Sequence, residues 1–190
     1  MTYADVLRPA AKRHALAYDL FLIIGSSLLV GLGAQVAIPL PFSPVPITGQ
    51  TLAVLLAGAM LGSRRGSLSV LLYLVEGLVG LPVFAGGTAG IGHLLGPTGG
   101  YLVGFVAAAF VTGWLAEKGW SRNVWTTLLA MLVGNVVLYG FGLPWLSIFV
   151  GGRAALTAGL LPFIPGDLIK AIAAAMLLPG GWKWIDGRRS

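Results

Sequence analysis

The stretch LPFIPGDLIKAIAAAMLLP, residues 161–179, places two charged side chains, Asp167 and Lys170, inside an otherwise apolar segment. A proline and a glycine interrupt the backbone just before Asp167, and most of the following residues are good helix formers, so a helix is expected over 166–178. Asp167 and Lys170 project from the same helical face, and Asp167 lies in the first turn, where the helix dipole favours a negative charge. The two side chains can therefore act on one ligand together.

Two interpretations of this pair remain open from the residues alone. Asp167 and Lys170 can neutralise each other as a structural ion pair that tolerates burial. Alternatively they form a functional site, because an ionisable residue at membrane depth costs about 3 kcal/mol on insertion scales and is by default a candidate for function. The apolar helix is only about 18 Å long and crosses little more than half of a ~30 Å hydrocarbon core. Its polar start is then expected in the outer part of the membrane, facing a cavity.

The composition predicts an integral membrane protein. The chain has 190 residues, of which 57% are hydrophobic and 9% charged, and its mean hydropathy is +0.90. Long apolar runs without alternating ten-residue segments favour helices over a barrel, so we expect an all-α membrane protein of one domain, residues 1–190. The six transmembrane helices are expected at about 18–38, 48–62, 66–80, 98–117, 123–143 and 166–178.

The charges indicate how the helices cross the membrane. The net charge of +6 comes from basic residues that lie between the apolar runs, which follows the positive-inside rule and argues against nucleic acid as a partner. If the N-terminus is cytoplasmic, 10 of the 12 Lys and Arg fall inside, all but Arg153 and Lys170. Both termini are then cytoplasmic and the site opens outward. With no cysteine and two histidines, neither a metal site nor a cofactor is expected.

Two loops stand out between the helices. Four prolines in PLPFSPVPITGQT, residues 39–51, forbid a regular helix and predict an extended, stiff connection. The glycine-rich stretch LPVFAGGTAGIGHLLGPTGGY, residues 81–101, predicts a pocket lid or a re-entrant loop whose backbone N–H groups are free to donate. Within it, His93 is either an interfacial residue or a ligand-binding one.

Other polar or small residues lie within the apolar helices. Asn135 and Tyr139 are four residues apart on one face, and Glu76 either faces the protein interior or lies near the outer interface. Ser27 and Gly31 form a small-xxx-small pair that lets another helix approach closely, either within the protein or from a partner. Thr48 precedes Gln50 at the start of the second helix, where it either caps that helix or lines a pocket.

Three motifs carry a resemblance to a known family. The segments PVPITGQTLAVLLAG (44–58), LLGPTGGYL (94–102) after a GG pair, and PFIPGDLIKA (162–171) are similar to those of the BioY family, the biotin-binding S components of energy-coupling factor (ECF) transporters. The resemblance covers nearly the whole chain. It implies that Asp167 and Lys170 contact biotin near the outer surface, that Tyr101 lines the pocket, and that Ser27 and Gly31 stand where the family has docking alanines.

The chemistry of biotin agrees with these residues. Its ureido ring carries N–H donors beside a carbonyl acceptor, which a carboxylate and an ammonium complement, and unpaired buried polar groups would cost about 1–3 kcal/mol each. Its thiophane ring and valerate arm need apolar and aromatic walls, which Tyr101, Tyr139 and Trp145 offer. Amides of the glycine loop or Arg153 are the open alternatives for the biotin carboxylate. The full set of expected ligand-binding residues is Asp167, Lys170, Tyr101, Gly86, Gly87, Asn135, Tyr139, Trp145 and Gln50.

The sequence contains no G-x-x-x-x-G-K-[ST] motif that would hydrolyse ATP. The resemblance therefore implies partners: a transmembrane coupling subunit and two ATPase subunits in a prokaryotic cell membrane. The alternatives are a solitary biotin transporter, an S component for another vitamin, and a membrane enzyme that uses Asp167, Lys170, Glu76 or His93 for acid–base chemistry. No nucleophile elbow or metal spacing accompanies those residues, so we do not expect an enzyme.

Overall fold

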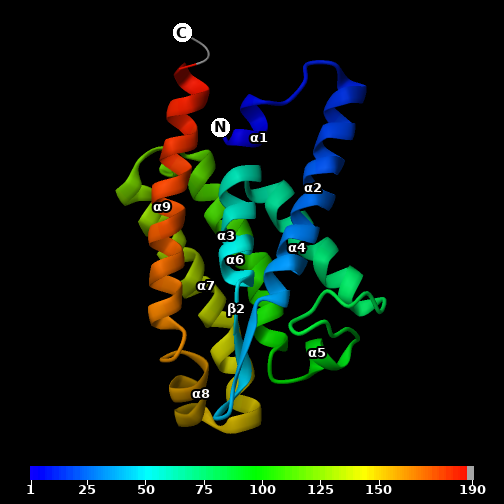
Figure 1. The fold of residues 1–190 in the computed structure, drawn as a ribbon, viewed down its shortest axis with the longest axis vertical. Coiled ribbons are helices and arrows are strands. Elements are labelled where there is room, and N and C mark those ends of the chain that lie inside the picture. Colours follow the sequence, from blue (N-terminus) through cyan, green and yellow to red (C-terminus); the bar gives the residue numbers. More distant parts are fainter. Residues whose placement is uncertain (188–190) are drawn as a thin grey trace.

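A computed structural model describes residues 1–187 of the chain, and these residues are mostly helical (Figure 1). In chain order the elements are α1 (Tyr3–Val6), α2 (Lys12–Gln35), β1 (Ala37–Leu40), β2 (Ser43–Thr48), α3 (Gln50–Leu61), α4 (Ser63–Leu78), α5 (Gly92–Leu95), α6 (Gly99–Glu117), the 3-10 turn η1 (Trp120–Arg122), α7 (Val124–Val150), α8 (Gly152–Gly159) and α9 (Ile164–Gly187). The predicted all-α class therefore needs one correction, which is the short sheet formed by β1 and β2.

Within the described residues, four helices are long and apolar enough to cross a membrane, namely α2, α6, α7 and residues 164–185 of α9. The chain is a multi-pass membrane protein by this criterion. The shorter α3, with 12 residues, and α4, with 16, lie on the other two predicted segments. A helix of 12 residues spans only about 18 Å, so the expected count of six transmembrane helices stays a prediction.

Two helices are longer than predicted, because each continues through a proline at which the sequence predicted its end. Helix α7 continues through Pro144 to Val150, and α9 continues through Pro179 to Gly187. Proline inside a helix costs about 3 kcal/mol, but residues beyond each proline pack well. Trp145 donates a hydrogen bond to the Gly96 carbonyl (2.9 Å), and Trp182 is only 2% exposed. These contacts offset the cost of the proline.

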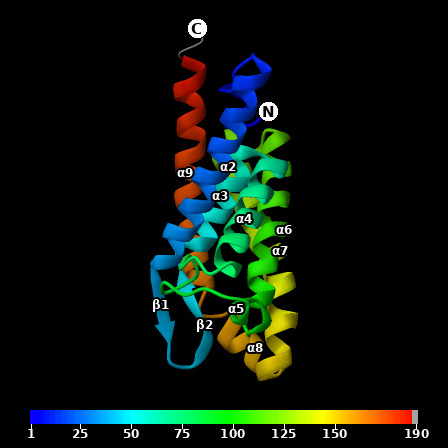
Figure 2. The same ribbon diagram turned by 90° about the vertical axis from the view of Figure 1, so that its right-hand side faces the viewer.

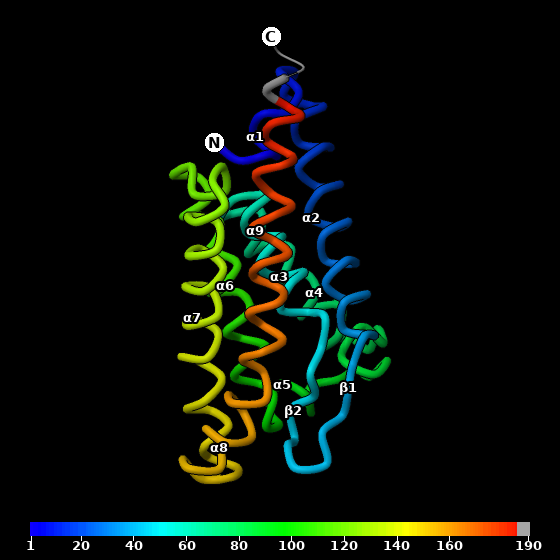
Figure 3. The backbone as a smooth tube through the Cα atoms, turned by 60° about the vertical axis from the view of Figure 1, so that its left-hand side comes forward, coloured from blue at the N-terminus to red at the C-terminus, as the bar shows by residue number. Residues whose placement is uncertain are grey.

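The proline-rich connection folds as a β-hairpin rather than as an unpaired extended loop. Its register pairs Ala37 with Thr48 and Leu40 with Ser43, with an irregularity between these pairs. Prolines are tolerated here because a two-stranded ribbon has edges at which an N–H is not required. The hairpin reaches α8, where the Ser43 hydroxyl donates to the Ala158 carbonyl (2.8 Å; Figure 3).

Helix α6 lies at the centre of the bundle and is its most buried candidate membrane span. Glycine allows it to pack closely, because a Cβ on Gly58 of α3 would overlap the backbone of Ala109 in α6. Side chains such as Val30, Val54 and Met131 fill the core. The outward faces of α2 and α9 are largely apolar and exposed, as expected for lipid contact.

The two ends of the molecule differ in structure. The N-terminus and the described end of α9 lie at one end (Figure 1), while the hairpin, α5 and α8 lie at the other (Figure 2). Helix α9 therefore begins at the hairpin end. The first turn of α9, which carries Asp167, is placed beside the loops rather than at the middle of the bundle.

Candidate ligand-binding site

Asp167 and Lys170 lie on one face of α9 as predicted, and their side chains form an ion pair. The Lys170 Nζ is 3.4 Å from Asp167 Oδ1. Asp167 is only 6% exposed, and it accepts hydrogen bonds from the Thr51 hydroxyl at Oδ1 (3.3 Å) and from the Tyr139 hydroxyl at Oδ2. A buried carboxylate is tolerated when it is paired and hydrogen-bonded in this way. Helices α3, α7 and α9 are thereby joined at one polar cluster.

Lys170 extends from this cluster towards the start of α3. Its ammonium donates to the Thr48 carbonyl (2.8 Å) and to the Thr51 hydroxyl (2.7 Å). Thr48 also accepts a hydrogen bond from the Gln50 amide at its hydroxyl (3.4 Å). Of the two roles considered from the sequence, the structure favours the pocket wall: the N-cap of α3 is Gly49, and Thr48 ends β2 and lines the cavity.

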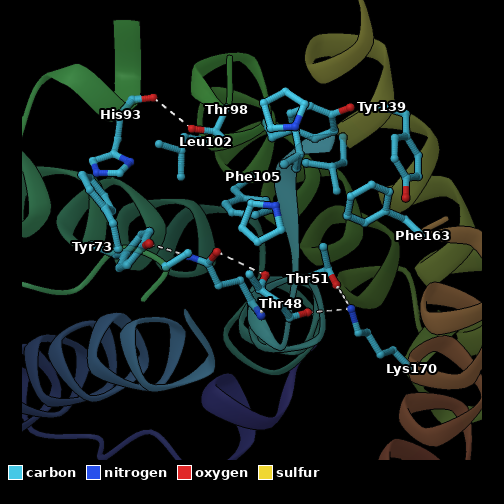
Figure 4. A pocket seen from close by; sticks show the side chains of 18 residues that line it. Thr48, Thr51, Tyr73, His93, Thr98, Leu102, Phe105, Tyr139, Phe163 and Lys170 are labelled. Atoms are coloured by element: carbon cyan, nitrogen blue, oxygen red, sulfur yellow. Dashed lines mark hydrogen bonds between the residues drawn. The ribbon is translucent and has the colours of Figure 1, made fainter. Parts of the chain in front are cut away.

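A cavity opens beside this cluster, with about 830 Å³ of empty space that includes its open side. Helices α3, α4, α6, α7 and α9, the hairpin and the glycine-rich loop all contribute to its wall (Figure 4). Its lining residues are Pro44, Val45, Pro46, Thr48, Gln50, Thr51, Tyr73, Phe84, Ala85, His93, Thr98, Tyr101, Leu102, Phe105, Leu138, Tyr139, Phe163 and Lys170. An apolar cavity with a few convergent polar groups is the usual form of a small-molecule site.

The aromatic part of the wall is held rigidly. Tyr101 is buried, its hydroxyl donates to the Gly159 carbonyl (2.9 Å), and its ring meets that of Tyr139 edge to face with centroids 6.3 Å apart. Gly142 faces the Tyr101 ring so closely that a Cβ there would overlap it. On the other side, Phe84 packs edge to face on Tyr73 at 5.5 Å. These fixed rings form a preorganised apolar slot.

Four of the nine predicted ligand-binding residues line the cavity: Lys170, Tyr101, Tyr139 and Gln50. Gln50 is buried and donates to the Tyr73 hydroxyl. Asp167 lies behind the wall, where it holds Lys170 and Tyr139 in place.

The other predicted residues are not among those that line the cavity. Trp145 fixes the loop before α6 through its bond to Gly96, and Gly86 and Gly87 form a turn with positive φ of 72° at each residue. Asn135 is buried one turn before Tyr139, towards the end that carries the termini. For these residues the sequence pattern indicated a tight turn or a buried polar side chain, but it did not indicate whether that position faces the cavity.

Ser27 and Gly31 pack inside the protein, one of the two alternatives left open by the sequence, and their docking to a partner stays a prediction. Ser27 is fully buried and donates to Glu76 Oε1 (2.9 Å), and a Cβ on Gly31 would contact Val83 and Tyr73. The small-xxx-small pair does bring a helix close, but that helix is α4 of the same chain. The hydrogen bond from Ser27 also shows that Glu76 faces the protein interior, which is one of the two positions that the sequence allowed for it.

Several lining residues were not assigned from the sequence. The sequence leaves two roles open for His93, and it does not single out Thr51, Tyr73, Phe84 or Phe163 as ligand contacts. Thr51 shares the polar start of α3 with Gln50, which was a usable signal. The others reach the cavity only through the folding of the 81–98 loop and the break before α9.

The fold and the cavity together define a helical membrane protein that binds a small molecule near one end of its bundle. Residues 8–187 match the BioY family, and the chain belongs to that family. It is 44% identical over 160 residues to a protein from Rhizobium etli called biotin transporter BioY, covering 80% of this chain and 86% of the relative.

Two further similarities concern an archaeal relative and a solved structure. The chain is 43% identical to a probable biotin transporter BioY of Pyrococcus horikoshii, covering 78% of this chain and 86% of the relative. A crystal structure of the S-component for biotin from an ECF-type ABC transporter superimposes with a TM-score of 0.81 at 30% identity, covering 92% of this chain and 95% of that one.

Proposed function

We propose that this chain binds biotin in the cavity beside α9 and takes part in its uptake as the S component of an ECF transporter. The observation that carries the proposal is the cavity itself, which joins the Lys170–Thr51 polar end to a rigid aromatic slot. The relatives are named biotin transporters, and the similar solved structure is an S component for biotin. The chain is accordingly a transporter component and not an enzyme.

The ligand fits the cavity by chemistry at both of its ends. The ureido carbonyl of biotin accepts a hydrogen bond from Lys170, and a ureido N–H donates to an oxygen of the Thr51–Asp167–Tyr139 cluster. Asp167 supplies the negative charge that pairs with the Lys170 ammonium. The thiophane ring then packs between the aromatic side chains, with Phe105 and Leu138 on the wall. Each unpaired buried polar group would cost about 1–3 kcal/mol, so this cluster rejects ligands without the ureido ring.

Energy for uptake comes from partners in this proposal, because the sequence carries no P-loop. A transmembrane coupling subunit and two ATPase subunits supply it, in the cell membrane of a prokaryote. Because Ser27 is inside the bundle, we expect the coupling subunit to dock on another surface than the Ser27–Gly31 pair.

The test is biotin binding by the detergent-purified protein. Mass spectrometry of protein expressed in biotin-containing medium is expected to detect bound biotin, and titration of the ligand-free protein is expected to saturate at one biotin per chain. Thiamine and riboflavin serve as controls, because each lacks the ureido ring. Saturation by either of these in place of biotin would contradict the proposal.

A further inference from the structure

The positive charge of Lys170 is already neutralised within the protein. A lysine ammonium has three N–H donors, and those of Lys170 have three acceptors: the Thr48 carbonyl, the Thr51 hydroxyl and the Asp167 carboxylate. A neutral carbonyl can share one of these donors. A ligand carboxylate would meet no net positive charge at Lys170, because the Asp167 carboxylate lies 3.4 Å from the ammonium and already balances it. The anionic end of a ligand therefore needs another partner.

The donors that the sequence offers for the carboxylate, Arg153 and the loop amides of residues 86–92, are not among the residues that line the cavity. Arg153, which belongs to α8, lines a separate depression at the junction of α7 and α8. In the glycine-rich loop, the amides of Gly87 and Gly90 are bonded to the carbonyls of Phe84 (3.1 Å) and Gly77 (2.8 Å). Neither glycine is among the residues that line the cavity.

His93 is the remaining basic side chain on the cavity wall. Its ring packs on Phe84 with centroids 5.4 Å apart, and its backbone carbonyl accepts a hydrogen bond from the Thr98 hydroxyl (3.1 Å). The ring contact holds the imidazole against Phe84, and the hydrogen bond from Thr98 fixes the backbone of His93. Its ring nitrogens have no hydrogen-bond partner among residues 1–187, and Figure 4 shows His93 and Lys170 on opposite sides of the cavity.

We propose that the imidazole of His93 donates a hydrogen bond to the carboxylate of the bound ligand and so selects the free acid over its neutral derivatives. This inference rests on the proposed function and gives the ligand a direction. The ureido ring lies at the Lys170 end, and the valerate arm extends towards His93. A hydrogen bond to a charged group is stronger than one between neutral groups, so the carboxylate contributes to affinity as well as orientation.

The experiment compares biotin with biotinamide, which keeps the rings and the arm but has a neutral amide in place of the carboxylate. Both ligands are titrated into the wild-type protein, His93→Leu, His93→Gln and the control Arg153→Gln. His93→Leu is expected to weaken biotin binding about ten- to a hundred-fold and to leave biotinamide binding nearly unchanged. His93→Gln keeps an N–H donor and is expected to lose less, while Arg153→Gln is expected to bind both ligands like the wild type.

The outcomes separate this inference from the proposed function. Equal weakening of both ligands in His93→Leu would show that the imidazole only packs on Phe84, and unchanged biotin binding would show that it has no role in recognition. Either result overturns the inference while biotin binding by the wild type still stands. Absence of biotin binding by the wild type would overturn the proposed function and the inference with it. Retained biotinamide binding in His93→Leu also demonstrates that the variant is folded.

Discussion

At the scale of single residues, the spacing of Asp167 and Lys170 predicted their contact correctly because residues three apart on a helix are neighbours in any fold. Their partners could not be predicted in the same way. Thr51 and Tyr139 reach Asp167 from two other helices, and that meeting depends on how α3, α7 and α9 pack. Tyr73 and His93 line the cavity for the same long-range reason.

Single and double replacement of Asp167 and Lys170 tests whether the pair recognises the ligand or only neutralises charge. We expect Asp167→Asn and Lys170→Met each to weaken biotin binding about ten- to a hundred-fold. Lys170→Met removes a charge-assisted hydrogen bond to biotin, worth about 1.5–3 kcal/mol, and Asp167→Asn removes the carboxylate that holds Lys170 in place. In the double variant no unpaired charge stays buried, so it is expected to insert and fold, yet it binds no better than either single variant. Isothermal titration of biotin measures all three.

The matched control for this series is Lys118→Met, which removes a lysine that lies over the Trp114 ring at the other end of the molecule. It is expected to bind biotin like the wild type. Recovery of near-native affinity in the Asp167→Asn, Lys170→Met double variant would show that the pair is only a structural ion pair.

At the scale of elements, helix positions were predictable wherever an apolar run has clear ends. Helix α6, expected over 98–117, is observed at Gly99–Glu117. Predictions failed at prolines, because a local rule ends a helix there while tertiary packing carries α7 and α9 onward. The hairpin was missed for a related reason: prolines exclude a helix, but strand pairing is set by the partner segment.

Glycine packing between α6 and α7 gives a prediction about the aromatic wall. Gly142→Ala places a methyl group against the Tyr101 ring and is expected to destabilise the protein by about 1–3 kcal/mol and to weaken biotin binding. Gly140→Ala is the matched control two residues away, because a Cβ there meets nothing within 4 Å. It is expected to be neutral or to stabilise α7 by up to about 1 kcal/mol. Thermal unfolding in detergent compares the two, and equal effects would rule out the proposed overlap.

The short helix α1 closes the end of the bundle that carries the termini. Tyr3 stacks on Trp182 and donates to the Leu178 carbonyl of α9. Arg65 of α4 pairs with Asp5 of α1 (2.8 Å) and with Asp19 of α2 (2.8 Å). Arg65, in the first turn of α4, thus ties three elements together.

Acid is expected to weaken this closure through Asp5. Burial raises the pKa of the Asp5 carboxyl, but hydrogen bonds from the Thr2 amide, Arg65 and the Thr2 hydroxyl outweigh it, so the pKa lies below its usual range. A lowered folded-state pKa stabilises the protein above the ordinary carboxyl value, and that contribution is lost as the pH falls from about 4 towards the lowered value. Asp5→Asn should therefore lower the thermal midpoint at pH 7, with a difference from wild type that shrinks in acid.

Arg65→Met supplies the control for that measurement. When Asp5→Asn is combined with Arg65→Met, the further drop in the thermal midpoint is expected to be smaller, because Arg65, the charged partner of Asp5, is already absent. A pH-independent difference between Asp5→Asn and the wild type would contradict the assignment.

At the scale of the whole molecule, charge and architecture coincide. The described Lys and Arg residues other than Arg153 and Lys170 lie just before or at the start of α2, at the start of α4, in the α6–α7 turn and near the end of α9. Arg188 and Arg189 lie outside the described residues. The N-terminus and the described end of α9 lie at that same end (Figure 1), whereas the hairpin and the glycine-rich loop, which contribute lining residues to the cavity, lie at the opposite end. The positive-inside rule therefore predicts that the basic end is cytoplasmic and that the cavity is nearer the outer surface.

Single-cysteine variants test this orientation without background labelling, since the chain has no cysteine. Phe42→Cys lies at the hairpin tip, where Phe42 is 63% exposed, and Lys118→Cys lies just after α6 at the opposite end. In intact cells an impermeant maleimide is expected to label Phe42→Cys, and Lys118→Cys only after the membrane is permeabilised. Both variants should label fully in detergent, which controls for reactivity. The reverse pattern in intact cells would place the cavity on the cytoplasmic side and exclude capture of external biotin.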